Sequence, residues 1–167
     1  MASTNFLSVP CRKKKSPKRM YCAYARNSSL TMTFIMPMTA ALIPELLSYL
    51  QNAGVQIAVA SNKYQAATQK LVDHYFPEIH FTAVFGQREG VKVKPDPIIV
   101  SDILEVAKVA KEEVLYVGDS GVDMQTAANA GVTACGVTWG FRPRTELEEF
   151  NPSYIADTAG EIKKLIL

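Results

Sequence analysis

The chain has 167 residues, a length that suggests one domain with a single hydrophobic core. Hydrophobic residues make up 48% of it and charged residues 20%, as in ordinary globular proteins, and no run of about 18 or more apolar residues predicts a membrane span. Three cysteines without metal-ligand spacing argue against a disulfide framework or a zinc site. Cys135, inside an apolar run, is expected to be a small buried hydrophobe.

The net charge of +2 conceals an uneven distribution of charge. Residues 1–44 contain seven Lys and Arg and no acidic residue, whereas the rest of the chain contains eleven Lys and Arg against sixteen acidic residues. We expect residues 1–28 to be a basic, disordered tail and residues 29–167 to form the folded core. Two other interpretations of the basic segment stay open: an organelle transit peptide, or a patch at residues 12–19 for nucleic acid or nuclear targeting.

From residue 29 onward, apolar periodicity and turn residues predict alternating strands and helices. The predicted strands are 29–36, 55–61, 81–86, 113–119, 132–140 and 154–157. The predicted helices are 40–54, 63–76, 94–110, 122–131, 144–150 and 159–167. This alternation indicates an α/β fold, a Rossmann-like three-layer sandwich with a mainly parallel sheet.

In such a sheet, ligands bind beyond the carboxyl ends of the strands. Two polar clusters follow predicted strands, at residues 61–63 and 119–123, and Lys94 lies in a loop before a helix. Asp119 and Asp123 form a pair of hard oxygen donors suited to Mg²⁺, although either could simply cap the helix.

Ser61 could bind phosphate oxygens through its hydroxyl and the amides of the following turn. Lys94 could reach a phosphate as a point charge. Taken singly, each has a simpler interpretation, because Ser61 could cap a helix and Lys94 could be a solvated surface lysine.

The order of these motifs in the chain favours the functional interpretations of Ser61 and Lys94 over the simpler ones. "VASNK" at 59–63, "KPDP" at 94–97 and "VGDSGVDMQTAANAG" at 117–131 resemble the second, third and fourth motifs of the haloacid dehalogenase superfamily. The likeness is greatest to its phosphoglycolate phosphatase branch and covers residues 40–167. The resemblance implies a Rossmann-like core and Mg²⁺-dependent hydrolysis of a small phosphomonoester.

The resemblance also implies roles for five residues. Ser61, Asn62 and Lys94 would bind phosphate, with Lys94 as a catalytic residue that neutralises the charge of phosphate and nucleophile. Asp119 would bind Mg²⁺, and Asp123 would support the ion directly or through water. Such a site works by positioning and by stabilising charge.

The family's first motif, Asp-x-Asp-Gly-Thr, has no counterpart here, because no aspartate precedes Asp73. Its first aspartate is the family's nucleophile. The helical cap domain is expected to be missing too. We therefore expect weak Mg²⁺ binding and a chain that, acting alone, is a poor or inactive phosphatase.

The missing motif would also remove a central strand and leave unpaired edges inside the sheet. We expect residues 29–36 to fill that slot, since a right-handed crossover to the strand before Ser61 is available. Met36, Pro37 and Met38 would then lie where the family has its catalytic aspartates.

Two alternatives to a phosphatase remain: a phosphate- or metabolite-binding module without turnover, and a basic-tailed interaction protein. The expected partner is a small phosphorylated metabolite. A membrane is not expected as a partner, nor is nucleic acid, since no aromatic interleaving or known module accompanies the basic residues 12–19. A cytoplasmic location is expected, or an organelle if residues 1–30 are a transit peptide.

Overall fold

The computed structural model describes residues 31–34 and 43–166. Its six strands form a parallel sheet in the order β3-β2-β1-β4-β5-β6, which confirms the predicted α/β class. The strands are β1 (Thr31–Phe34), β2 (Gln56–Tyr64), β3 (Ala83–Gln87), β4 (Val114–Gly118), β5 (Thr133–Val137) and β6 (Tyr154–Ala156). The helices are α1 (Ile43–Asn52), α2 (Gln65–Tyr75), α3 (Ile98–Ala107), the 3-10 helix η2 (Lys111–Glu113), α4 (Gly121–Ala130), α5 (Arg144–Glu149) and α6 (Ala159–Ile166).

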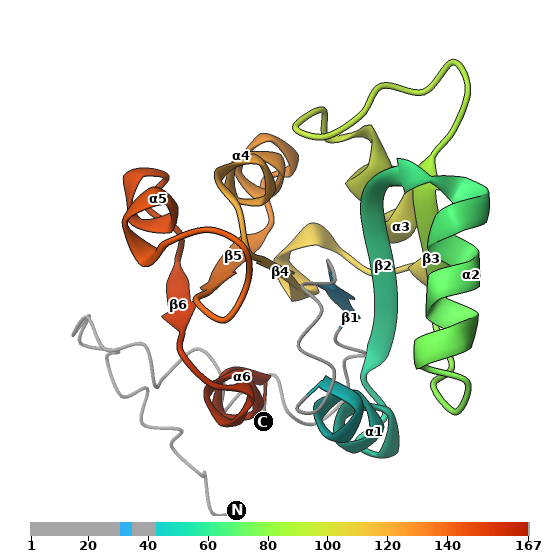
Figure 1. Ribbon diagram of the computed structural model, residues 1–167, viewed down its shortest axis with the longest axis horizontal. Helices are drawn as coiled ribbons and strands as arrows, with labels where there is room; N and C mark the ends of the chain where they lie inside the picture. The colour runs from blue at the N-terminus through green and yellow to red at the C-terminus, as the bar shows by residue number, and fades with distance from the viewer. Residues whose placement is uncertain (1–30, 35–42, 167) are drawn as a thin grey trace, which may run out of the picture.

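Strand β1 occupies the middle of the sheet, between β2 and β4 (Figure 1). Its last residue, Phe34, pairs with Val59 on one side and Val117 on the other. The prediction that this segment fills the central slot is thus confirmed for residues 31–34. Met36, Pro37 and Met38 lie outside the described residues, as does the predicted tail at 1–28.

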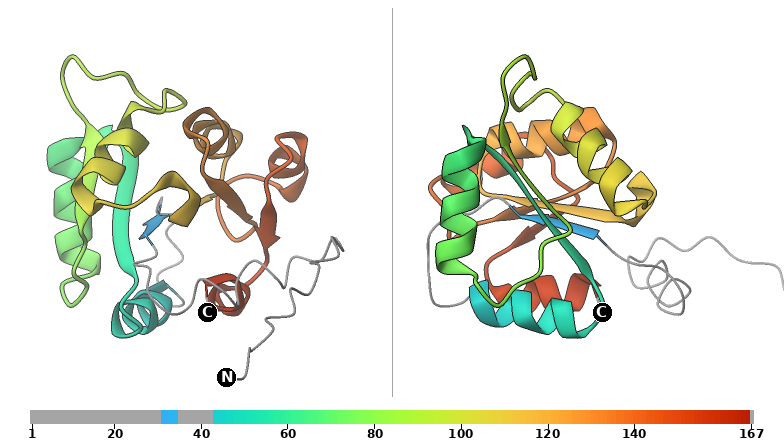
Figure 2. Two further views of the ribbon diagram at one scale, coloured as in Figure 1. Left: turned by 180° about the vertical axis from the view of Figure 1, so that it is seen from behind. Right: turned by 90° about the vertical axis from the view of Figure 1, so that its right-hand side faces the viewer.

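Helices cover both faces of the sheet, which gives three layers (Figures 1 and 2). Helices α1 and α6 lie side by side on one face, and α3, α4 and α5 cover the other, while α2 packs against β2 and β3. Each face has its own core. The first is built around Leu46, Leu50, Ile57, Val117 and Ile162, and the second around Ile99, Ile103, Tyr116, Met124 and Leu147.

Left-handed residues end two helices where the sequence predicts a stop. Gly131 has φ +69° and its N–H bonds the Ala127 carbonyl, as expected for a helix C-terminus. Gly54, at φ +79°, follows α1. Helix α3 is shorter than predicted: Asp96 accepts a bond from the Ile98 N–H at its start, and Lys108, in the left-handed region, follows its last residue.

Strand β2 is longer than predicted, since it continues past Ser61 to Tyr64. Only its first half is buried, and its pairing with β3 shifts register between Ala60 and Tyr64. The sequence predicted an end at Ser61 because apolar residues stop there; backbone pairing instead continues through a bulge, which needs no apolar side chain. Ser61 therefore lies inside an irregular strand end.

Two smaller expectations can be compared with the structure. Cys135 is fully buried in the first core, as expected, and burial raises the pKa of its thiol to about 12. Within the described ranges, no helix combines the length and hydropathy needed to cross a bilayer.

Candidate functional site

The predicted site residues gather at the carboxyl edge of the central strands. Ser61 and Asp119 are each two residues beyond a partner of Phe34, on opposite sides of β1. Parallel pairing therefore brings both to the same level of the sheet. The long loop between β3 and α3 carries Lys94 to this edge, and Asp123 reaches it from the first turn of α4.

Lys94 is buried, and its ammonium group is held on two sides. Its Nζ lies 2.9 Å from Asp123 Oδ1 and 3.3 Å from the Ala60 carbonyl oxygen. An ammonium group has three N–H donors, so one donor is left over among the contacts of the described residues. The interpretation of Lys94 as a solvated surface lysine is wrong, because the side chain is only 4% exposed.

Asp123 is a fully engaged carboxylate. While Oδ1 accepts from Lys94, Oδ2 accepts from the Ser120 hydroxyl at 2.7 Å and from the Asp119 N–H at 3.3 Å. Ser120 is the N-cap of α4, so Asp123 takes part in the helix start. It anchors Lys94 to α4 as well, which a simple cap would not do.

Asp119 follows β4 directly and keeps one oxygen available. Its Oδ2 accepts from the Phe141 N–H at 2.8 Å, whereas Oδ1 has no hydrogen-bond partner among the described residues. Gly118 and Gly140 allow the tight packing here, because a Cβ on Gly118 would collide with Asp123 and one on Gly140 with Asp119.

Ser61 is half-buried and accepts the Lys63 N–H at 3.1 Å. Because its oxygen is the acceptor in that bond, the hydroxyl hydrogen stays free to be donated to an anion. Asn62 is used differently: its amide forms two bonds with the backbone of Lys94, to the carbonyl at 3.1 Å and from the N–H at 3.0 Å.

Burial dominates the electrostatics of the cluster. It lowers the pKa of Lys94, and the adjacent Asp123 opposes that shift. Burial also raises the pKa of Asp119, opposed by the Phe141 N–H. Both shifts record that the charged forms are poorly hydrated here, so an opposite charge entering from solvent would interact strongly with them.

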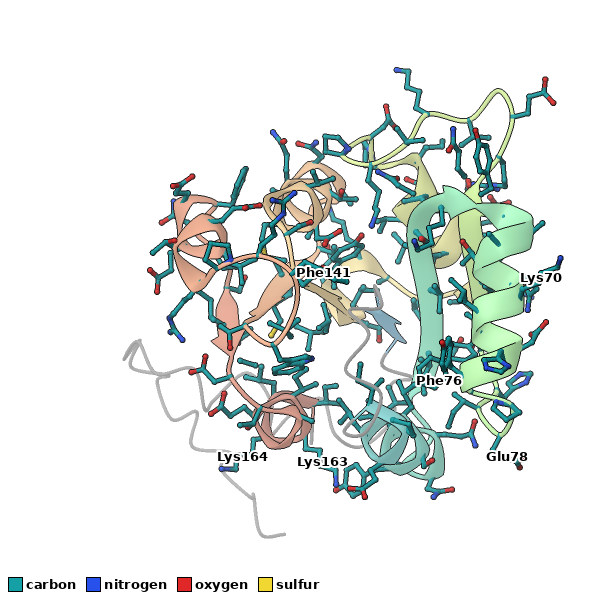
Figure 3. The ribbon with its side chains drawn as sticks, viewed as in Figure 1. Lys70, Phe76, Glu78, Phe141, Lys163 and Lys164 are labelled. Carbon is teal, nitrogen blue, oxygen red and sulfur yellow. The ribbon has the colours of Figure 1, made fainter. Side chains whose placement is uncertain are left out.

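Three contributing residues were given no role in the site from the sequence, although Ser120 belongs to the predicted polar cluster at 119–123. Asn129 of α4 donates to the Pro95 carbonyl at 2.8 Å, Ser120 holds Asp123, and Phe141 supplies the N–H on Asp119. Figure 3 labels Phe141, whose ring is exposed, close to β4. Of these, only Ser120 had a signal, since a serine three residues before an acidic residue is typical of a helix start.

The described residues offer a cation few ligands. No group of three or more His, Cys, Asp and Glu side chains within residues 31–34 and 43–166 could hold a metal ion. Asp119 Oδ1 is the one free carboxylate oxygen of the pair, because both oxygens of Asp123 are bonded. Such a donor set fits Mg²⁺ that keeps most of its water.

Chemically, this arrangement can hold an anion beside a hydrated cation. A buried ammonium group with a spare N–H, a serine hydroxyl and a free carboxylate oxygen all belong to one edge of the sheet. This combination suits a phosphate ester, whose oxygens can be neutralised by a lysine and by a divalent ion.

Comparisons with known proteins agree with this geometry. A phosphoglycolate phosphatase from Vibrio parahaemolyticus is 28% identical over 124 residues, 74% of this chain and 54% of that protein. A provisionally named pyrophosphatase, PpaX, from Caldanaerobacter subterraneus is 30% identical over 74% of this chain and 56% of its own length. A crystal structure from Lactobacillus delbrueckii, provisionally named a phosphoglycolate phosphatase, superposes with a TM-score of 0.71 at 37% identity, covering 75% of this chain and 52% of that one.

The chain thus spans about half the length of the curated relatives it matches. The family model described as haloacid dehalogenase-like hydrolase matches residues 13–137, well over half of the sequence. With the parallel sheet and the polar cluster at its carboxyl edge, this match identifies the chain as a member of the haloacid dehalogenase-like hydrolases.

Proposed function

We propose that the cluster at the carboxyl edge is the phosphate site of a phosphoglycolate phosphatase-like enzyme, which hydrolyses a small phosphomonoester with Mg²⁺. The observation that carries this proposal is the convergence of Lys94, Asp119 and Asp123 from three separate segments, with Lys94 buried against Asp123 at 2.9 Å. Burying a charged lysine costs free energy that its pairing with Asp123 offsets only in part, and an incoming phosphate would supply a further opposite charge.

In this proposal the residues divide the work. Lys94 donates its spare N–H to a phosphate oxygen and neutralises charge, and Ser61 donates its hydroxyl. Asp119 Oδ1 would hold Mg²⁺, while Asp123 orients Lys94 and would support the ion directly or through water. The ion, when bound, supplies charge stabilisation to the phosphoryl group.

The proposal includes slow turnover by these 167 residues on their own. Their sequence has no aspartate before Asp73 to serve as the covalent nucleophile, and loss of a nucleophile costs on the order of 10⁶ in rate in a serine protease. A binding module without turnover is the second candidate, and the same observation favours it. The small phosphorylated partner and a cytoplasmic location belong to this proposal.

The test combines binding and hydrolysis. With Mg²⁺, inorganic phosphate should raise the thermal midpoint of the wild-type protein, since a ligand at 100 times its Kd stabilises by about 2.7 kcal/mol. Asp119→Ala should abolish the shift, and Lys94→Met should reduce it by weakening phosphate affinity. Lys70→Met is the matched control, because Lys70 points away from the sheet on α2 (Figure 3). Absence of a phosphate-dependent shift in the wild type would overturn the proposed site.

Hydrolysis separates the two candidates. Phosphoglycolate, pyrophosphate and an aryl phosphate are incubated with the wild-type chain, with Asp119→Asn and with the Lys70→Met control. Slow release of phosphate that Asp119→Asn abolishes would support a hydrolase with slow turnover, whereas fast release by the wild-type chain would contradict the slow-turnover part. Binding without release supports the binding module.

A further inference from the structure

We propose that Asn62 and Asn129 are positioning residues that clamp the Lys94 loop from two sides and so aim the lysine at the site. The proposal deepens the proposed function, on which it rests for the role of Lys94. The clamp is defined here as the side-chain amides of Asn62 and Asn129 with their bonds to the backbone of Lys94 and Pro95.

The first half of the clamp imitates a strand pairing. Asn62 donates to the Lys94 carbonyl at 3.1 Å and accepts from the Lys94 N–H at 3.0 Å. Both backbone groups of Lys94 are therefore satisfied by one side chain on the irregular end of β2. A loop without such partners would leave these groups to water and would fluctuate more.

The second half comes from α4. Asn129 donates to the Pro95 carbonyl at 2.8 Å, one residue beyond the bonds from Asn62. Helix α4 also carries Asp123, which holds the ammonium group of Lys94, and β2 carries Ala60, whose carbonyl accepts from the same group. Each of the two elements thus holds the lysine loop at its backbone and at its charged end.

This double attachment answers a physical problem. A lysine side chain has a flexible four-carbon stem and loses about 2 kcal/mol of rotamer entropy when it is fixed in one conformation. Burying its charge also costs free energy. Fixing the backbone of Lys94 and Pro95 limits the positions that the lysine side chain can sample. We therefore expect the two asparagines to act through Lys94 and not by touching phosphate.

Chemical labelling tests the clamp without any phosphate. Acetic anhydride modifies accessible amines, and mass spectrometry compares Lys94, whose side chain is 4% exposed, with Lys92, whose side chain is 83% exposed. In Asn62→Ala the labelling rate at Lys94 relative to Lys92 should rise about tenfold, the factor for one to two neutral hydrogen bonds. Asn129→Ala should give a smaller rise, because it removes one bond.

The matched control is Asn52→Ala, because Asn52 is an exposed asparagine at the end of α1. It should leave the labelling ratio unchanged. An unchanged ratio in both Asn62→Ala and Asn129→Ala would overturn the clamp. This result is independent of whether the protein binds phosphate, so it separates failure of the clamp from failure of the proposed function.

Phosphate affinity then distinguishes a positioning residue from a direct ligand. If Asn62 acts through the lysine, Asn62→Ala weakens phosphate binding about tenfold in the wild type but adds nothing in Lys94→Met. Equal weakening in both backgrounds would mean that Asn62 contacts phosphate itself and would overturn the assignment.

Discussion

Two groups of ion pairs in this molecule use the same side-chain chemistry in opposite surroundings. Lys94 and Asp123 meet at 2.9 Å, with 4% and 3% of their side chains exposed. Arg144 meets Glu148 and Asp157 at 2.8 and 2.9 Å, with about half of each side chain exposed. Because the distances match, the two groups differ mainly in burial. The first group lies at the proposed phosphate site, where its positive charge would attract an anion, and the second group is exposed to solvent.

The largest expected effect comes from breaking the buried pair. Asp123→Ala leaves the Lys94 ammonium group without its carboxylate and removes the acceptor of Ser120 and of the Asp119 N–H. We expect a loss of about 3–5 kcal/mol in unfolding free energy, measured by urea denaturation. Glu148→Ala is the control on the exposed side, and a loss below about 1 kcal/mol for Asp123→Ala would contradict the contrast.

Close packing behind the buried group can be broken without touching a charge. A methyl group at Gly118 would collide with Asp123, so Gly118→Ala should cost about 1–3 kcal/mol and disturb the Lys94 pair. Gly160→Ala is matched to it, because the nearest atom to a Cβ there, Thr158 Oγ1, is 3.8 Å away. That variant in α6 should be neutral or stabilising by up to about 1 kcal/mol. Equal losses of unfolding free energy in the two glycine variants would contradict the expected effect of close packing at Gly118.

The two regions should also respond to pH with opposite signs. Burial raises the pKa of Asp119, whereas hydrogen bonds from Thr138 and Arg144 lower that of Asp157. Above the raised pKa, the charged form of Asp119 therefore costs stability, and this cost disappears as pH falls below the ordinary aspartate value. The charged form of Asp157 contributes stability above the ordinary value, and that contribution disappears as pH falls through its lowered pKa.

Replacing each aspartate with the uncharged asparagine tests these opposite signs by thermal denaturation without Mg²⁺. Asp119→Asn should raise the midpoint at pH 7, and Asp157→Asn should lower it. Both differences from the wild type should shrink at acid pH. If both variants shift the midpoint in the same direction at pH 7, the assignment of opposite environments is wrong.

The smallest effect is expected for the exposed group. Arg144→Ala removes bonds to Glu148 and Asp157 at the surface, where water and salt screen charges. We expect a change in thermal midpoint close to the error of the measurement, and no change on adding salt. A loss of stability comparable to that of Asp123→Ala would show that burial does not explain the difference between the two groups of ion pairs.

Much of this protein could be predicted from the order of its residues. Apolar periodicity predicts the strands and helices, and Gly131 and Gly54 mark helix ends because few other residues adopt positive φ. Even the use of residues 31–34 as the central strand could be inferred, since an unpaired gap inside a sheet is costly.

The motifs likewise predict that Ser61, Lys94 and Asp119 belong to one site, because strand ends in a parallel sheet meet at one edge. The extension of β2 past Ser61 could not be predicted, since backbone pairing through a bulge has no apolar signature. The attachments of Asn62 and Asn129 to the Lys94 loop could not be predicted either. These contacts join residues about thirty positions apart, and only the folded chain brings them within hydrogen-bonding distance.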